Sequence, residues 1–539
     1  MRNGAKTAII GGVFAAMVGG AAYGGYVLVD ELGFGSDAEP KKSGPPSAAE
    51  VRTATEAFFT AWEKGDPSGA AQATNNAAEA RPVFIGYKDA AGLTDVEITP
   101  KAARGATVPY SVRATVTHEG LSEPVAYESS LTVVRGVTTG RPLVDWKPSV
   151  VHPKLKDKDD ALVTGKASTP SVQAVDRDGR VLDSKKYPSL APVLTQLRSV
   201  YGERVGGTPG VELAVRHAGD VPDTPLVTLA EGQPGKLPTT LSARAQAAAE
   251  KAVLRYPESS VVAVRPSTGE VLAVANHRAD EFNAAFQGEL APGSTMKIVT
   301  AAMLIEGGVV TADGAAPCPD TAVWQSQTFK NITGLRPNTA ADFTNSFQRS
   351  CNTAFIKLID EEPVTDESLT RTAEDKFGLG RDDWRTGIAS FDGRVPVSTG
   401  PDRAANAIGQ GRVQMSPLTM ASVTATAMTG SFRQPHLVAK SLDDREFAKA
   451  EGLAPDTVAQ LRQMMAATAR VGSGAGAMRG LSGDIGAKTG SAEVDRQATA
   501  NSWFVGYRGD VAAAAVAQQG GRGSDSAGPI VADVLRNGS

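Results

Sequence analysis

A serine and a lysine three residues apart are the first candidates for chemistry in this chain. Ser294 and Lys297 lie in the stretch 291–305, where Pro292 and Gly293 precede a long apolar run. This order predicts a helix start followed by a buried helix. Residues at i and i+3 share one helix face. Because burial lowers the pKa of a lysine, Lys297 could accept the proton of a Ser294 nucleophile.

Two further short motifs follow along the chain. Ser350-Cys351-Asn352 is the only Ser-x-Asn in the sequence, and Lys488-Thr489-Gly490 comes later, before a strand-like run at 503–507. Each motif alone is weak, since a capping serine, a loop asparagine or a lysine on a surface strand would look the same. Their order along one chain is therefore what favours a shared catalytic site.

The elements expected to position these motifs start near residue 241. A helix is predicted over 241–255, and the apolar runs 260–264 and 271–275 are joined by a Pro-Ser-Thr-Gly turn, which predicts a hairpin. The segment 156–241 is richer in charge, Pro and Gly, with short strands at 172–175 and 211–215. It is interpreted as a linker or pedestal.

The N-terminal part predicts a small α+β domain. Residues 48–64 carry an apolar face at helical spacing, and a Gly-Asp-Pro turn ends the helix. Alternating apolar residues predict strands at 108–116, 125–133 and 142–146. One helix and an antiparallel sheet would then end near residue 155.

Composition limits the possible functions. The 539 residues are 41% apolar and 21% charged, with a net charge of −4, which fits several packed domains and gives no global case for nucleic-acid binding. The two cysteines exclude a disulfide-rich scaffold and a four-cysteine cluster. The five histidines lack the spacing of a metal pair, so no metal centre is expected.

The first residues predict a membrane anchor. Arg2 and Lys6 precede the uncharged stretch 7–29, which as a helix would be about 34 Å long, and acidic residues follow it. This charge order favours a cytoplasmic N-terminus with the rest of the chain outside. A cleaved signal peptide and a soluble helix are the alternatives. The polar segment 31–47 is then a tether.

In this order the three motifs match the serine set of penicillin-binding proteins and class A β-lactamases. The region from about 240 to 539 resembles the penicilloyl-serine transferases, and Gly409-Gln410-Gly411 and the segment 416–421 look like the same family. The whole chain resembles class B penicillin-binding proteins with an N-terminal domain like that of the methicillin-resistance transpeptidase. Residues 144–149 resemble the exit of that domain.

The resemblance implies a multidomain α+β fold. Its C-terminal transpeptidase domain, which is β-lactamase-like, would have a central antiparallel sheet with helices on both faces. The expected parts are a cytoplasmic tip and anchor (1–30), a flexible tether (31–47), a small nuclear-transport-factor-like domain (48–155), a pedestal or dimerisation-like domain (156–240) and the penicillin-binding transpeptidase domain (241–539).

The resemblance also assigns roles to residues. Ser294 would be acylated, Lys297 would accept its proton, and Ser350 would relay a proton to the leaving amine. Asn352 would hold a substrate carbonyl and orient Lys297, while Lys488 and Thr489 would bind the substrate carboxylate. Gly490 would leave room for the acyl-peptide, and the backbone N–H groups of Ser294 and Ser491 would form the oxyanion hole.

The state of the two cysteines is open at this point. Cys351 lies inside the second motif, and an oxidising environment outside the membrane would permit a disulfide with Cys318. Two separate thiols are the alternative, and only geometry can decide between them.

The expected function is a serine D,D-transpeptidase that cross-links peptidoglycan stem peptides through an acyl-enzyme and is inhibited by β-lactams. The resemblance implies no cofactor and no nucleic acid, with stem peptides, β-lactams and other cell-wall synthesis proteins as partners. One alternative is a D,D-carboxypeptidase or β-lactamase, although no Glu-x-x-x-Asn pattern lies between Asn352 and Lys488. A non-catalytic β-lactam sensor or scaffold is the other.

Overall fold

The computed structural model describes residues 44–137, 139–167, 172–219, 221–280, 282–494 and 497–538. The described chain divides into two compact units between Val163 and Thr164. Over the described ranges, no helix combines the length and the apolar character that crossing a bilayer requires. The expected anchor at 1–30 and most of the tether lie outside these ranges.

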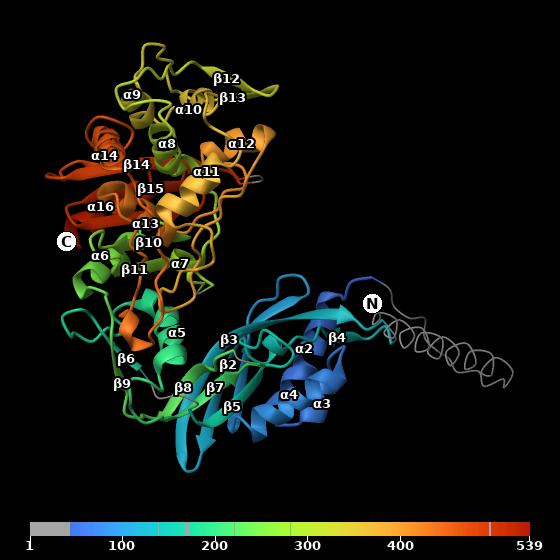
Figure 1. Cartoon of the computed structure of the whole chain (residues 1–539). Helices are drawn as coiled ribbons and strands as arrows, with labels where there is room; N and C mark the ends of the chain where they lie inside the picture. The colour runs from blue at the N-terminus through green and yellow to red at the C-terminus, as the bar shows by residue number, and fades with distance from the viewer. Residues whose placement is uncertain are drawn as a thin grey trace, which may run out of the picture. The chain divides into compact units, whose positions relative to one another are not determined.

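In its described residues, the N-terminal unit has three helices and one antiparallel sheet, drawn in blue to cyan in Figure 1. The helices are α2 (Ala48–Glu63), α3 (Pro67–Gln72) and α4 (Ala77–Asp89). The sheet has the order β1 (Leu93–Pro100), β2 (Thr107–His118), β3 (Leu121–Arg135), β4 (Pro142–Val144), and a short turn η1 (Pro148–Val150) follows. The expected helix and strands are confirmed as α2, β2, β3 and β4.

The sequence interpretation expected one helix here and missed α3, α4 and β1. Pro82 lies inside α4, where a proline removes a backbone donor and argues against a helix. A bulge between Thr94 and Glu97 breaks the alternation of β1. Aromatic side chains fill the core of this unit, with Trp62 and Phe84 packed edge to face at a centroid distance of 5.5 Å.

The boundary between the two units falls within the strand β5 (Ala161–Lys166), and short strands and one helix follow it. The three-stranded sheet has the order β5, β7 (Val211–Arg216), β8 (Thr224–Ala230), and β6 (Val172–Val175) pairs in parallel with β9 (Gly235–Pro238). The helical elements are η2 (Pro188–Leu190) and α5 (Ala191–Tyr201). The short strands expected at 172–175 and 211–215 are therefore confirmed.

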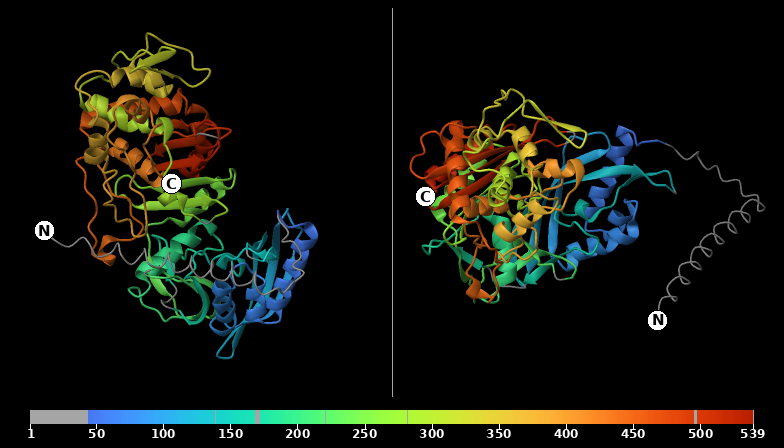
Figure 2. Two further views of the ribbon diagram at one scale, coloured as in Figure 1. Left: turned by 90° about the vertical axis from the view of Figure 1, so that its right-hand side faces the viewer. Right: turned by 45° about the horizontal axis from the view of Figure 1, so that its top comes forward.

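A five-stranded antiparallel sheet organises the rest of this unit. Its order is β11 (Val271–His277), β10 (Ser259–Val264), β16 (Val511–Ala517), β15 (Asn501–Arg508), β14 (Ile485–Ala492), and in the left view of Figure 2 the red strands continue into the green ones as one layer. The expected hairpin is β10–β11, and the expected helix 241–255 is α6 (Ala243–Val253). β14 is an edge strand, so one row of its backbone groups remains available for pairing.

Helices cover both faces of this sheet, because alternate strand residues point in opposite directions. α6 and α16 (Ala527–Asn537) pack with Val261, Ala263 and Phe504 on one face. α8 (Lys297–Glu306) and α13 (Pro417–Thr429) pack with Val262 and Val505 on the other. The expected multidomain α+β architecture, with helices on both faces of an antiparallel sheet, is confirmed.

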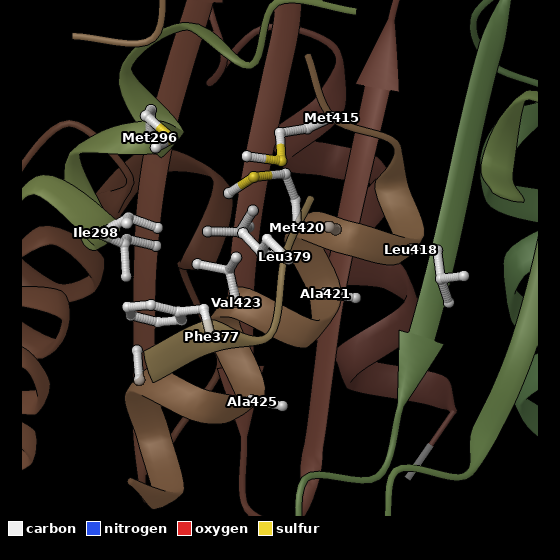
Figure 3. Close-up of a cluster of buried hydrophobic side chains, with 14 of the residues drawn as sticks. Met296, Ile298, Phe377, Leu379, Met415, Leu418, Met420, Ala421, Val423 and Ala425 are labelled. Atoms are coloured by element: carbon white, nitrogen blue, oxygen red, sulfur yellow. The ribbon is translucent and has the colours of Figure 1, made fainter. Parts of the chain in front are cut away.

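The α8–α13 layer is filled by long apolar side chains. Figure 3 shows Met296 and Ile298 close to Met415, Met420 and Val423, all of them buried. A capping box between Ser416 and Thr419 starts α13. The core therefore holds the segment around residue 296 rigidly in place.

The remaining elements surround this core. They are α7 (Ala284–Gln287), η3 (Gly293–Met296), β12 (Thr321–Trp324), β13 (Gln327–Lys330), α9 (Phe343–Gln348), α10 (Asn352–Leu358), α11 (Ser368–Arg371), η4 (Thr372–Lys376), α12 (Gly400–Ala407), η5 (Lys440–Leu442), α14 (Pro455–Arg470) and α15 (Ala475–Met478).

Candidate active site

Ser294 lies in η3, directly before α8. The sequence predicted one helix over 291–305, whereas the structure has a 3₁₀ turn that passes into the α-helix at Lys297. Residues at i and i+3 eclipse one another in a 3₁₀ turn. The Lys297 Nζ accordingly lies 3.0 Å from the Ser294 Oγ, within hydrogen-bond distance.

Neutral oxygens surround the Lys297 amine. Its Nζ also donates to the Asn352 Oδ1 at 2.6 Å and to the Ser350 carbonyl at 2.9 Å. It lies over the Phe355 ring, 5.4 Å from the centroid. Burial, and next the positive charge of Lys488, hold the pKa of Lys297 well below its usual 10.5. This lysine is therefore able to act as a base.

The second motif lies between α9 and α10. Ser350 has a φ of 62°, a left-handed conformation that is uncommon for a residue with a side chain and is found at functional sites. This backbone turn directs the Ser350 carbonyl to Lys297 and its hydroxyl to Lys488, with Lys488 Nζ 2.8 Å from the Ser350 Oγ. Ser350 therefore connects the two lysines.

Lys488 is buried on the edge strand β14. Besides Ser350, its Nζ donates to the carbonyl of Thr489 at 2.9 Å, and it lies 5.5 Å from the centroid of the Phe347 ring. Burial lowers the pKa of Lys488 from 10.5 to about 7. At neutral pH this amine exists in both protonation states.

The third motif has a partner that the sequence analysis did not identify. The Thr489 Oγ1 lies 2.7 Å from the Ser473 Oγ, in the turn between α14 and α15. Ser473 N–H also donates to the carbonyl of Gln348, just before the second motif. The signal in the sequence was a serine between two glycines, Gly472 and Gly474, which is too common to stand out.

Close backbone packing joins η3 to β14. A Cβ at Gly490 would lie 2.8 Å from the Pro292 carbonyl, and one at Gly293 would lie 2.5 Å from the Ser491 carbonyl. Gly293 also has a φ of 54°, which favours glycine. Glycine at both positions lets the backbone around Ser294 approach that of Ser491.

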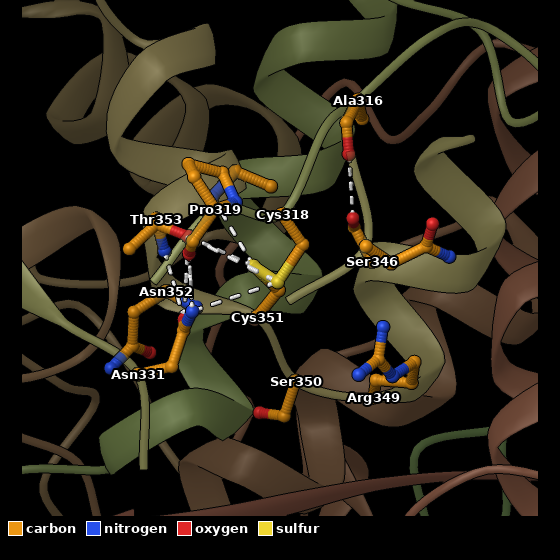
Figure 4. Close-up of a disulfide and its surroundings, with 12 residues drawn as sticks. Ala316, Cys318, Pro319, Asn331, Ser346, Arg349, Ser350, Cys351, Asn352 and Thr353 are labelled. Carbon is orange, nitrogen blue, oxygen red and sulfur yellow. Dashed lines mark hydrogen bonds between the residues drawn. A yellow bond between two sulfur atoms is a disulfide. The ribbon is translucent and has the colours of Figure 1, made fainter. Parts of the chain in front are cut away.

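The two cysteines form a disulfide, Cys318–Cys351, which decides between the two alternatives left open by the sequence. Both residues are completely buried. Figure 4 shows the disulfide beside Asn352 and Thr353, behind the second motif. The covalent bond fixes one end of the loop that carries Ser350.

The structure thus brings the three predicted motifs together. The Ser294 hydroxyl is within hydrogen-bond distance of the buried Lys297 amine, which also binds the Ser350 carbonyl. The Ser350 hydroxyl is in turn hydrogen-bonded to the second buried amine, Lys488. Such an arrangement can deprotonate a serine nucleophile and return a proton to a leaving group. This is the chemistry of acyl transfer.

Comparison with known proteins gives two family matches. The model of the penicillin-binding protein transpeptidase domain matches residues 259–536, and that of the NTF2-like N-terminal transpeptidase domain matches residues 50–159. The first model covers more than half of the chain. The second confirms the resemblance of the N-terminal domain to that of the methicillin-resistance transpeptidase.

Two relatives carry the name peptidoglycan D,D-transpeptidase PbpA. The one from Mycolicibacterium smegmatis is 29% identical over 375 residues, covering 57% of this chain and 73% of the relative. The one from Mycobacterium tuberculosis is 27% identical over 326 residues, covering 51% of this chain and 64% of the relative. The chain thus spans about two thirds of the length of these relatives.

Solved structures share the fold. Pseudomonas aeruginosa PBP2 in complex with WCK 5153 matches with a TM-score of 0.53 and 21% identity, over 68% of this chain and 96% of that chain. The D,D-transpeptidase domain of an Eggerthella lenta peptidoglycan glycosyltransferase matches with a TM-score of 0.52 and 23% identity, over 69% of this chain and 97% of that chain. A chain of a peptidoglycan synthase complex matches with a TM-score of 0.55 and 20% identity, over 72% of this chain and 93% of that chain.

The sequence motifs, the sheet with helices on both faces and the family match over 259–536 agree with one another. The expectation of a serine-type penicillin-binding transpeptidase is confirmed at the level of the family. This chain belongs to the penicillin-binding protein transpeptidase family.

Proposed function

We propose that this protein is a serine D,D-transpeptidase that cross-links peptidoglycan stem peptides through an acyl-enzyme on Ser294. The observation that carries the proposal is the hydrogen bond between Lys297 and Ser294, made by a lysine whose pKa burial holds well below its usual value. The names of the PbpA relatives support the substrate class.

Acylation starts with the neutral amine of Lys297. It takes the proton of the Ser294 Oγ as this oxygen attacks the carbonyl carbon of the penultimate D-Ala of the donor peptide. The backbone N–H groups of Ser294 and Ser491 stabilise the oxyanion that forms, and the close approach of Gly293 to Ser491 supports this pairing. Removing one such donor typically costs about 10²–10³ in rate.

The carbon–nitrogen bond then breaks, and the departing D-Ala amine needs a proton. Ser350 supplies it from its hydroxyl and is reprotonated by Lys488, 2.8 Å away. The amine of a second stem peptide then attacks the resulting ester and gives its proton through Ser350 to the neutral Lys488. As the ester bond breaks, Lys297 returns its proton to the Ser294 Oγ, which regenerates the hydroxyl. In a β-lactam the leaving nitrogen stays attached to the acyl group, so the adduct persists and the enzyme is inhibited.

Substrate recognition uses the edge of β14. Thr489, held by Ser473, donates to the terminal carboxylate of the donor peptide, and the nearby Lys488 provides positive charge when protonated. The side-chain amide of Asn352 holds a peptide carbonyl. The acyl peptide lies along the open edge of this strand.

The catalytic unit works on the outer side of the cell membrane, with the uncharged segment 7–29 as a single-pass anchor. The basic residues before that segment and the acidic ones after it support this orientation. Other cell-wall synthesis proteins are expected partners, and the fold shared with a peptidoglycan synthase complex supports this.

Labelling with a fluorescent penicillin, followed by peptide mapping and a chase, tests the proposal. We expect one stable adduct on Ser294 and loss of labelling in Ser294→Ala, while Ser267→Ala, in an exposed turn, labels as the wild type does. Label on another residue would contradict the site assignment. Rapid release of hydrolysed penicillin would instead favour a hydrolase, and full support of growth by Ser294→Ala would favour a sensor or scaffold.

A further inference from the structure

The side chain of Asn331 holds the start of the helix that carries Asn352. Its Oδ1 accepts from the backbone N–H of Asn352 at 2.7 Å and of Thr353 at 3.2 Å. These are two of the N–H groups that a helix leaves without a partner at its first turn. Asn331 lies just after β13, so it ties this hairpin to the first turn of α10 (Figure 4).

The other end of the Asn331 amide is held equally firmly. Its Nδ2 donates to the carbonyl of Pro319 at 2.8 Å and lies 3.1 Å from the Thr353 hydroxyl oxygen. Pro319 follows Cys318, whose disulfide partner Cys351 precedes Asn352. The amide thus joins three chain segments, and both its donor and its acceptor are used, which an aliphatic side chain could not do.

The hairpin that Asn331 anchors also orients the Asn352 amide. The Nδ2 of Asn352 donates to the carbonyl of Lys330, the residue before Asn331, at 3.0 Å. The two ends of an amide have nearly the same shape but opposite polarity. The Lys330 carbonyl therefore selects the orientation in which the Asn352 Oδ1 faces the Lys297 amine at 2.6 Å.

We propose that Asn331 is a positioning residue for the acyl transfer. It holds the Lys330 carbonyl and the start of α10 so that the Asn352 oxygen faces Lys297 and the remaining amide proton faces the substrate carbonyl. This proposal rests on the proposed function. Asn331 itself touches neither the nucleophile nor the base in the hydrogen bonds described above.

Loss of Asn331 should change both the rate and the pH dependence of acylation. An acceptor oxygen stabilises the charged form of an amine. If the Asn352 oxygen turns away, the protonated form of Lys297 is disfavoured, and this base becomes weaker. The acidic limb of the acylation rate should then move to lower pH while the plateau falls. A misplacement of about 1 Å can cost about 10²-fold in rate.

The test is penicillin acylation kinetics between pH 5 and pH 9 for the wild type, Asn331→Ala and Asn331→Asp, corrected for the folded fraction of each protein. We expect a fall of about 10- to 100-fold and a shifted acidic limb in the alanine variant. The aspartate keeps an acceptor for the two N–H groups but loses the donor to the Pro319 carbonyl, so its rate should fall less than that of the alanine variant.

The matched control is Asn338→Ala. Asn338 is also partly buried, and its side chain is hydrogen-bonded to Asn345 and to the N–H of Ala340 in the same region. Loss of the Asn338 side chain should leave the acylation rate of the folded protein and the acidic limb of its pH profile unchanged. The proposal would be overturned if Asn331→Ala and Asn338→Ala changed the acylation rate equally. It would also be overturned if the acidic limb of the pH profile were unchanged in Asn331→Ala.

If Asn331→Ala does not fold, Asn331→Ser is measured in its place. The shorter hydroxyl can accept from only one of the two N–H groups, so the same directions of change are expected, and an unchanged rate again overturns the proposal. Failure of the wild type to be acylated on Ser294 would instead refute the proposed function, so the two failures are distinguishable.

Discussion

Replacing Lys488 with methionine should remove a pH-dependent contribution to the stability of the fold. Burial lowers the pKa of Lys488 from 10.5 to about 7. Between these two values the unfolded chain binds a proton that the folded chain does not bind. The free energy of unfolding of the wild type therefore rises with pH in this window, and below pH 7 both states carry the proton.

The size of this effect follows from the pKa difference. One pKa unit corresponds to about 1.4 kcal/mol. From pH 7 to pH 9 the wild type should gain about 2 kcal/mol from Lys488, because the folded amine is half protonated at the lower pH and neutral at the higher. Methionine has a similar length and no charge, so Lys488→Met should lose this gain.

In both the wild type and Lys488→Met, Lys297 also makes the free energy of unfolding rise with pH. The quantity to compare is therefore the slope of the free energy of unfolding against pH in the two proteins. The positive charge of Lys488 lowers the pKa of Lys297, so without that charge the Lys297 pKa lies closer to its usual value. The free energy of unfolding of the variant then rises even less with pH. Urea unfolding followed by tryptophan fluorescence at pH 7, 8 and 9 measures both slopes, with Lys251→Met on an exposed face of α6 as the control. Equal slopes in the wild type and Lys488→Met would refute the reasoning.

Two further predictions test other parts of the chain. A Cβ at Gly409 would lie 1.8 Å from the Gly293 carbonyl, so Gly409→Ala should slow penicillin acylation at least about 10-fold, while Gly480→Ala, with a similar positive φ and open space, should not. In the N-terminal unit, burial lowers the pKa of His152 from 6.5 to about 4. As pH falls, His152 binds a proton in the unfolded chain before it does so in the folded chain, so the free energy of unfolding should fall by as much as about 3 kcal/mol between pH 6.5 and pH 4. His152→Gln should reduce this loss in unfolding curves measured across the same pH range.

The sequence was sufficient where the physical pattern is local. The three-residue spacing of Ser294 and Lys297, in an apolar run after Pro-Gly, predicted both a buried lysine and its contact with the serine. The hairpin β10–β11 was predicted for the same reason, since its two strands are joined by a short turn. Such features depend on neighbouring residues only.

Features that depend on distant parts of the chain could not be predicted from local patterns. The sheet places β16 between β10 and β15, although more than two hundred residues separate β10 from β16 in sequence. Ser473 and Asn331 are single polar residues outside the helices and strands, and only the folded chain shows that they hold Thr489 and Asn352. The family resemblance brought the motifs together, but it carried no information about these supports.

The two lysines explain why Ser350 needs its strained conformation. One amine binds the Ser350 carbonyl and the other its hydroxyl, so both positive charges would lie within a few ångströms in a buried site. Like charges so close disfavour double protonation. At neutral pH the two amines are therefore not protonated together. A neutral Lys297 can receive a proton from Ser294, while a protonated Lys488 can supply one through Ser350. An extended backbone at Ser350 could not present both groups, one to each amine, and the site would lose the connection between its base and its acid.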